Sequence, residues 1–125
     1  MVYKVLVLAL GGALGTVSRF TVSKFSQRFI GGDFSWGTAA VNLIGCFIIG
    51  FLWSLSNEKD LLTPLSRLFF MVGFLGAFTT FSTYALETMN FYREDEFLYM
   101  AGSIVLNNLL GFLMVIVGIW LARVL

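Results

Sequence analysis

Four long apolar segments separated by short polar connections dominate the pattern of hydrophobic and polar positions along the chain. The segments cover about residues 5–26, 36–55, 65–92 and 97–122. Each is long enough for the ~20 residues with which an α-helix crosses a membrane. The connections leave no room for a soluble domain or a linker. The pattern therefore predicts an all-α integral membrane protein, with a single domain of four transmembrane helices over residues 1–125.

The third segment is long enough to hold an interruption, and its centre is unlike an ordinary lipid-facing helix. Residues 73–84 contain two glycines, four Ser or Thr hydroxyls and four aromatic rings. Glycine weakens a helix, and hydroxyls compete for backbone partners. In hydrocarbon, a loosened backbone is tolerated only against protein or a water-filled path. We expect either a tight helix contact or a helix broken near residues 76–80 at an ion or substrate site.

The first apolar segment begins near the N-terminus and superficially resembles a signal peptide. It continues past Arg19, and three more apolar segments follow it. We therefore interpret it as a first spanning helix that is kept. Gly31-Gly32-Asp33 is expected to end this helix, and Pro64 is expected at the start of the third.

The composition supports a membrane location and excludes several kinds of site. Of the 125 residues, 58% are hydrophobic and 12% are charged, and the mean hydropathy is +0.90. A soluble domain of this size needs more polar surface. The net charge of +1 offers no basic field for nucleic acid. The absence of histidine and the single cysteine, Cys46, exclude a Cys/His zinc site and an intrachain disulfide.

Lysine and arginine are divided almost equally between the two sides of the predicted bundle. One side has Lys4, Lys59, Arg67 and Arg123, and the other has Lys24, Arg28 and Arg93, joined by Arg19 if it is counted. Positive residues in short loops normally set orientation. The balance has two interpretations: the orientation is merely hard to predict, or the chain inserts both ways and pairs head-to-tail with itself.

Polar and small residues form stripes on the first two predicted helices. Gly11, Gly15 and Arg19 recur at i, i+4 and i+8, so the glycines favour close helix packing. Arg19 continues that face and is expected to attract anions into a vestibule, the alternative being a snorkelling arginine. In the second helix, Thr38 and Asn42 share a stripe. A buried amide needs partners, and an interhelical hydrogen bond and a pore-lining role are equally supported for Asn42.

The last two predicted helices carry further polar positions. Thr80, Thr83, Tyr84 and Glu87 fall on one helical face, and the rings of Phe81 and Tyr84 are i, i+3 neighbours. Glu87 is the only acid well inside a predicted span, which favours a functional role over a simple paired acid near the interface. In the fourth helix, Asn107 and Asn108 point ~100° apart, so we expect one to face a pore and the other a neighbouring helix. Gly111 and Gly118 share a face for close packing.

These side chains favour anion permeation over catalysis. The chain has no histidine, no HExxH motif and no paired intramembrane carboxylates, so we predict that it is not an enzyme. The spans instead offer donors, namely the amides of Asn42 and Asn108 and the hydroxyls of Thr38, Thr80, Ser82 and Thr83. Aromatic ring edges add weak positive potential. Such donors suit a small anion that sheds water stepwise and can still leave.

Over nearly its whole length the chain resembles the small fluoride channels of the Fluc or CrcB family. The resemblance rests on Gly11-Gly12-x-x-Gly15-x-x-x-Arg19 in the first helix and on Gly37-Thr38 and Val41-Asn42-Leu43 in the second. In the third it rests on Gly76-x-x-Thr79-Thr80-Phe81-Ser82-Thr83, with Glu87 four residues on. The chain departs from the family at Tyr84, where the family has a second pore phenylalanine, and at Ala77, where it has a glycine.

This resemblance implies an antiparallel, dual-topology homodimer with two fluoride pores in the cell inner membrane or plasma membrane. It implies passive fluoride export that lowers cytoplasmic fluoride. It also implies a structural sodium ion at the dimer centre, held by the backbone carbonyls of Gly76 and Thr79. The implied anion pathway contains Asn42, Phe81, Ser82 and Thr83, to which we add Thr38, Tyr84 and Asn108. Arg19 and Glu87 are assigned to a vestibule.

Two other classes of protein fit the same pattern of helices. A proton-coupled exporter of the small multidrug-resistance type would use Glu87 as its membrane-embedded acid. The first helix has no such acid, and Glu87 lies near a helix end. A purely structural partner subunit would use only the glycine faces and would carry no flux.

Overall fold

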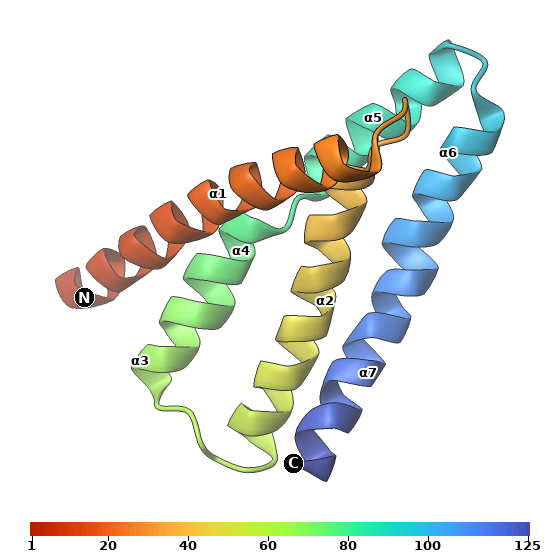
Figure 1. Cartoon of the computed structure of the whole chain (residues 1–125). Helices are drawn as coiled ribbons and strands as arrows, with labels where there is room; N and C mark the ends of the chain where they lie inside the picture. Colours follow the sequence, from red (N-terminus) through yellow and green to blue (C-terminus); the bar gives the residue numbers. More distant parts are fainter.

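The structure is a computed structural model that describes all 125 residues, and it is entirely helical. Four helical stretches are long and apolar enough to cross a membrane, namely Val2–Ile30, Trp36–Asn57, Pro64–Arg93 and Phe97–Val124 (Figure 1). They indicate a multi-pass membrane protein and confirm the four predicted spans. Each stretch extends a few residues beyond its predicted bounds at one end or at both.

The third and fourth spans are composite. The third consists of α3 (Pro64–Arg67), the π-helical η1 (Leu68–Phe74), α4 (Leu75–Phe78) and, after a break, α5 (Phe81–Arg93). The fourth consists of α6 (Phe97–Ile104), the π-helical η2 (Val105–Leu110) and α7 (Gly111–Val124). The first two spans, α1 (Val2–Ile30) and α2 (Trp36–Asn57), are uninterrupted.

The predicted helix-end signals act as expected. α1 ends where Gly31 and Gly32 adopt positive φ angles of 76° and 82°, a conformation that glycine reaches without steric cost. α3 begins with Pro64 in its first turn, and the Thr63 side chain caps it by accepting the Ser66 N–H.

Glycines set the distances between the helices. α2 packs along α7, where Gly50 faces the Val115 carbonyl and Gly118 faces the Phe47 carbonyl. α1 lies across η1 and α4, with Gly11 and Gly15 against their backbone (Figure 1). A Cβ at any of these four positions would lie closer to a backbone atom than van der Waals radii allow. The predicted close-packing role of Gly11, Gly15 and Gly118 is therefore confirmed.

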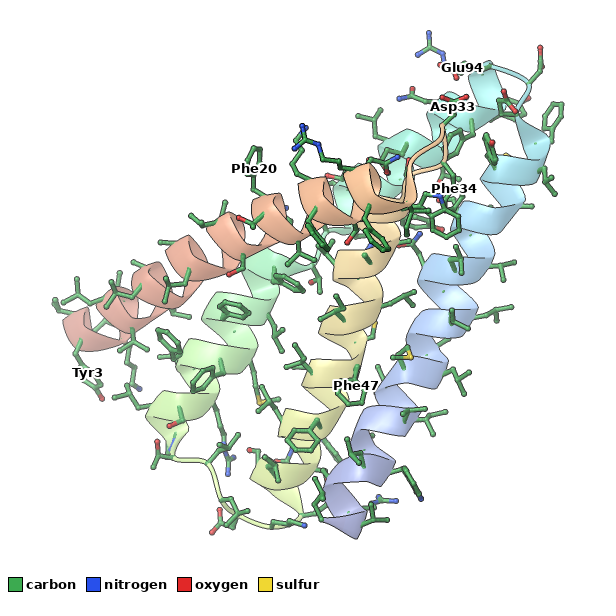
Figure 2. All side chains as sticks on the ribbon, viewed as in Figure 1. Tyr3, Phe20, Asp33, Phe34, Phe47 and Glu94 are labelled. Atoms are coloured by element: carbon green, nitrogen blue, oxygen red, sulfur yellow. The ribbon has the colours of Figure 1, made fainter.

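Only two small clusters of apolar side chains are buried within the chain. One contains Val41, Leu75 and Phe78, and the other contains Phe34, Ala39 and Phe91. Most other apolar side chains project outward, as Phe20 does from α1 (Figure 2). A bilayer is as apolar as leucine, so a spanning helix loses nothing by presenting such side chains to lipid.

One ion pair ties the C-terminal end of α2 to the end of α7. Arg123 donates through Nε to Oε2 of Glu58 at 2.9 Å, and the Ser54 hydroxyl donates to the same oxygen at 2.7 Å. The hydrogen bonds from Arg123 and then from Ser54 lower the pKa of Glu58 to about 2. The connection between α2 and α3 lies at this end of the bundle, and those between α1 and α2 and between α5 and α6 lie at the other (Figure 1).

Candidate functional site

The third span breaks at Thr79 and Thr80, where the backbone becomes extended. Their φ/ψ angles are −86°/158° and −148°/111°. The break predicted for residues 76–80 is therefore real but shorter, because Gly76 stays within α4. α5 restarts at once, since the Thr80 hydroxyl oxygen caps it by accepting the Thr83 N–H at 3.3 Å. Thr80 thus leaves the helical face that we predicted it to share with Thr83, Tyr84 and Glu87.

Asn42 of α2 braces the extended backbone from the side. Its Oδ1 accepts the Thr80 N–H at 2.8 Å, and its Nδ2 donates to the Thr80 carbonyl at 3.1 Å. The same Nδ2 also donates to Oδ1 of Asn107 at 2.8 Å. The amide therefore joins three spans, which confirms the interhelical hydrogen bonding considered for Asn42 and uses both of its N–H donors.

The break removes the helical donors of two carbonyl groups. The Thr80 N–H, which would bond Gly76 in a continuous helix, bonds Asn42 instead. The Thr83 N–H, which would bond Thr79, bonds the Thr80 hydroxyl. Gly76 is exposed, and a Cβ built on it meets no atom within 4 Å. The carbonyls predicted to hold a cation have both lost their helical partners.

A central cavity of about 350 Å³ opens beside the break. Its lining is Asn42, Gly45, Cys46, Ile49, Met71, Leu75, Gly76, Thr79, Thr80, Phe81, Tyr84, Asn107 and Asn108. Asn107 and Asn108 both line it, and Asn107 also bonds Asn42 of the neighbouring α2, so which of the two faces a pore stays a prediction. They lie in η2, whose wider i→i+5 turn brings neighbouring side chains closer in direction than an α-helix does.

The two aromatic residues after the break form an edge-to-face pair. The ring centroids of Phe81 and Tyr84 are 5.5 Å apart and the planes are inclined by 64°, as the i, i+3 spacing predicts. Tyr84 is buried, whereas Phe81 is 75% exposed and projects from the chain. Nδ2 of Asn108 donates to the Tyr84 hydroxyl oxygen at 2.7 Å.

Arg19 faces a second cavity, of about 220 Å³, on the α1 side of the break. Thr16, Arg19, Phe20, Ser23, Lys24, Val41, Thr80 and Thr83 line it. Thr80 lines this cavity and the central one, so the two adjoin at the break. Lys24 brings a second positive charge to this cavity, a role that we did not assign to it from the sequence. The spacing of Thr16, Phe20, Ser23 and Lys24 along one face of α1 was the available signal. Ser82 lies on the exposed surface and lines neither cavity.

Two remaining predicted residues, Thr38 and Glu87, meet near the N-terminal end of α2. The Thr38 hydroxyl donates to Oε1 of Glu87 at 2.9 Å, a pairing that sequence spacing did not reveal. Both line a cavity of about 300 Å³ that shares Ser23 and Lys24 with the Arg19 cavity. The second carboxylate oxygen of Glu87, Oε2, is buried and has no hydrogen-bond partner. Cavities that contain hydrogen-bonding side chains thus follow one another from Glu87 past Arg19 to the break.

Comparison with known proteins places these features in a family. Residues 6–119 match the family described as CrcB-like protein, Camphor Resistance (CrcB). A protein of Nitrosococcus oceani named fluoride-specific ion channel FluC is 42% identical over 117 residues, covering 94% of each chain. One of the same name from Desulforapulum autotrophicum is 43% identical over 123 residues, covering 98% of each chain. Such a match over almost the full length shows that the chain belongs to the CrcB-like family.

Proposed function

We propose that the chain forms a fluoride-specific ion channel of the cell inner membrane or plasma membrane. This proposal rests on relatives named as fluoride-specific channels, which are 42% and 43% identical to the chain over almost its full length. The polar side chains among those that line the cavities around the broken third span supply hydrogen-bonding groups for an anion in hydrocarbon. Flow is passive, so fluoride leaves the cell down its gradient and its cytoplasmic concentration falls. The protein is a channel and not an enzyme.

The arrangement of charges supports entry of an anion from the α1 side. Arg19 and Lys24 line the second cavity, so their positive charge raises the local concentration of anions there. Thr83 lies in the same cavity and offers a hydroxyl. Its oxygen accepts the Thr80 hydroxyl at 3.0 Å, so its own proton is free to donate to an ion. Ser82 and Phe81 extend the path on the exposed side of the break.

What the single chain leaves uncovered supports the proposal of a homodimer. Gly76, Phe81, Ser82 and Thr83 are exposed beside a break in the middle of a predicted span. Lipid cannot satisfy free backbone groups at that depth, whereas protein can. The near-equal division of Lys and Arg between the two ends allows both orientations. A second, antiparallel copy is the partner that meets both requirements.

The chain's own residues fit a structural sodium ion at the centre of this dimer. Gly76 and Thr79 would hold it through carbonyl oxygens that have lost their helical donors, and oxygen is the ligand that a hard cation prefers. Each copy would supply both carbonyls. When bound, the ion would satisfy these groups and add positive potential beside the anion path.

The direct test is flux from liposomes that contain the purified protein. Liposomes loaded with fluoride should release it rapidly once a potassium ionophore compensates charge, and liposomes loaded with chloride should release little. Efflux of chloride as fast as that of fluoride would refute the proposed specificity. Absence of any flux would favour a purely structural subunit.

The dimer is tested by forcing one orientation. About three lysines added to one terminus should bias insertion, and the singly oriented population should lose flux. Co-expression with an oppositely biased copy should restore it. Full activity from one orientation alone would contradict an antiparallel dimer.

Gly76→Val tests the proposed contact between the two copies at Gly76 without changing the charge of the chain. Within one chain the added side chain has open space, so the folded protomer should survive. Dimer formation and flux should both be lost if a second copy packs against Gly76. Sodium withdrawal should likewise reduce the dimer population, and a dimer indifferent to both changes would contradict the proposed centre.

The proton-coupled exporter receives no support from the structure. It needs Glu87 as a cargo-exchanging acid, and Glu87 is engaged by Thr38 outside the central cavity. Loss of lipophilic-cation transport in Glu87→Gln would be its signature.

A further inference from the structure

Most donors in the central cavity are already used within the chain. The Thr79 hydroxyl donates to the Leu75 carbonyl at 3.0 Å, and the Thr80 hydroxyl donates to Thr83 at 3.0 Å. Both N–H groups of Asn42 are taken by the Thr80 carbonyl and by Asn107. These groups hold the break together, so an ion in the cavity would have to compete with existing hydrogen bonds for them.

The two asparagines of η2 have little capacity left. Nδ2 of Asn107 donates to the Ser103 carbonyl at 2.8 Å, which leaves it one N–H. Nδ2 of Asn108 donates to the Ile104 carbonyl at 2.9 Å and to the Tyr84 hydroxyl oxygen at 2.7 Å, which leaves it none.

The Ile104 contact decides the direction of the bond to Tyr84. A carbonyl oxygen can only accept, so the Asn108 atom beside it is the amide nitrogen and not the oxygen. The same nitrogen lies 2.7 Å from the tyrosine oxygen, which must therefore accept. The phenol proton points away from Asn108, and no group of the chain accepts it. The ring is buried and packed edge-to-face on Phe81, so the hydroxyl is held in place.

We propose that the Tyr84 hydroxyl is an anion-binding donor of the central cavity, and that Asn108 is a positioning residue that directs the phenol proton to the ion. The inference rests on the proposed function and names a specificity-determining group for it. A bond from a fixed hydroxyl to a charged acceptor is stronger than one to a neutral acceptor. Fluoride concentrates its charge more than chloride does and gains more from such a donor.

The test compares initial fluoride efflux at increasing fluoride concentration for the unmodified protein and for Tyr84→Phe. Removing the hydroxyl should raise the half-saturating fluoride concentration about tenfold, while fluoride still passes. Tyr99→Phe is the matched control, because that ring packs on Phe34 and Phe91 away from the cavity. Its half-saturating concentration should not change.

Asn108→Leu separates positioning from binding. It should raise the half-saturating concentration by less than Tyr84→Phe does, because the hydroxyl remains but is no longer oriented. In the Tyr84→Phe background it should add nothing, since there is no proton left to direct. Additive effects of the two substitutions would contradict the positioning role.

Three results would overturn the inference. An unchanged half-saturating concentration in Tyr84→Phe would show that the hydroxyl does not bind the ion. A smaller dimer population at unchanged half-saturation would show that the phenol donates to the second copy. Absence of fluoride flux in the unmodified protein would overturn the proposed function and this inference with it.

Discussion

The α2–α7 contact and the break between α4 and α5 are two solutions to packing in an apolar solvent. Along α2–α7, Gly50 and Gly118 bring the two backbones together. At the break, the backbone leaves the helix, and the amide of Asn42 replaces the lost partners of Thr80. In lipid the first contact gains van der Waals energy, whereas the second avoids the cost of unpaired polar groups.

The difference between these two regions shows which of them has groups available to bind an ion. A glycine contact offers no free hydrogen-bonding group to a ligand, because its backbone N–H and C=O groups are hydrogen-bonded within each helix. The break keeps its backbone paired through one side chain and leaves two carbonyls without helical donors beside a cavity. Substitutions should therefore damage the first region through crowding and the second through lost hydrogen bonds.

The largest effect is expected from Asn42→Leu. It leaves the Thr80 N–H, the Thr80 carbonyl and Asn107 Oδ1 without partners, and each orphaned group is costly in hydrocarbon. The free energy of unfolding should fall by about 3 kcal/mol or more, and fluoride flux should be lost. Unfolding in mixed detergent micelles measures the first and liposome efflux the second. Asn57→Leu, at the exposed end of α2, should behave as the unmodified protein does; equal losses in both variants would contradict the bracing role.

Gly118→Ala should break the α2–α7 contact by crowding alone. The added methyl group would collide with the Phe47 carbonyl, and the Phe51 nitrogen would lie 2.9 Å from it. We expect a loss of about 1–3 kcal/mol in the free energy of unfolding. Gly12→Ala is the matched control, because its nearest neighbour, the Gly73 carbonyl oxygen, is 3.9 Å away. A stable Gly118→Ala protein would show that the two helices separate readily.

Thr79→Ser keeps the hydroxyl of the break and removes only a methyl group. The bond from the side chain to the Leu75 carbonyl can persist, and the backbone carbonyl is unchanged. Stability should fall by about 0.8 kcal/mol for the lost methyl group, with flux and sodium dependence retained. Loss of sodium dependence in this variant would mean that the side chain, and not the backbone, serves the proposed ion.

The smallest effect concerns the ion pair that closes the end of the α2–α7 contact. The pKa of Glu58 is lowered from its ordinary 4.5 to about 2, so the pair stabilises the fold above pH 4.5. This contribution is lost as the pH falls towards 2, because the carboxylate is then protonated in the folded state too. The melting temperature of the unmodified protein should drop slightly across this range. A Glu58→Gln protein should lack that part of the pH dependence, and identical curves would contradict the assignment.

Much of the architecture follows from local pattern. Apolar length predicted the four spans, the paired glycines after Ile30 and Pro64 marked helix ends, and the spacing of Gly11 and Gly15 predicted a close contact. The mixture of glycines and hydroxyls predicted a break near residues 76–80, and the structure confines it to Thr79 and Thr80. Gly76 stays helical because the bonds that compete with the helix are made at Thr80, by Asn42 from another span.

The spans, the break and the polar residue types can be read from the sequence alone, because each depends on neighbours along the chain. Which polar groups are hydrogen-bonded within the fold and which remain free depends on contacts between the spans. Asn42 uses both its N–H donors within the fold, and Glu87 accepts a hydrogen bond from Thr38. The Tyr84 hydroxyl accepts from Asn108, so its own O–H remains available as a donor. These pairings join residues 24 to 65 positions apart. Hydrogen bonds depend on distance and direction in space, which helical spacing along one segment does not contain.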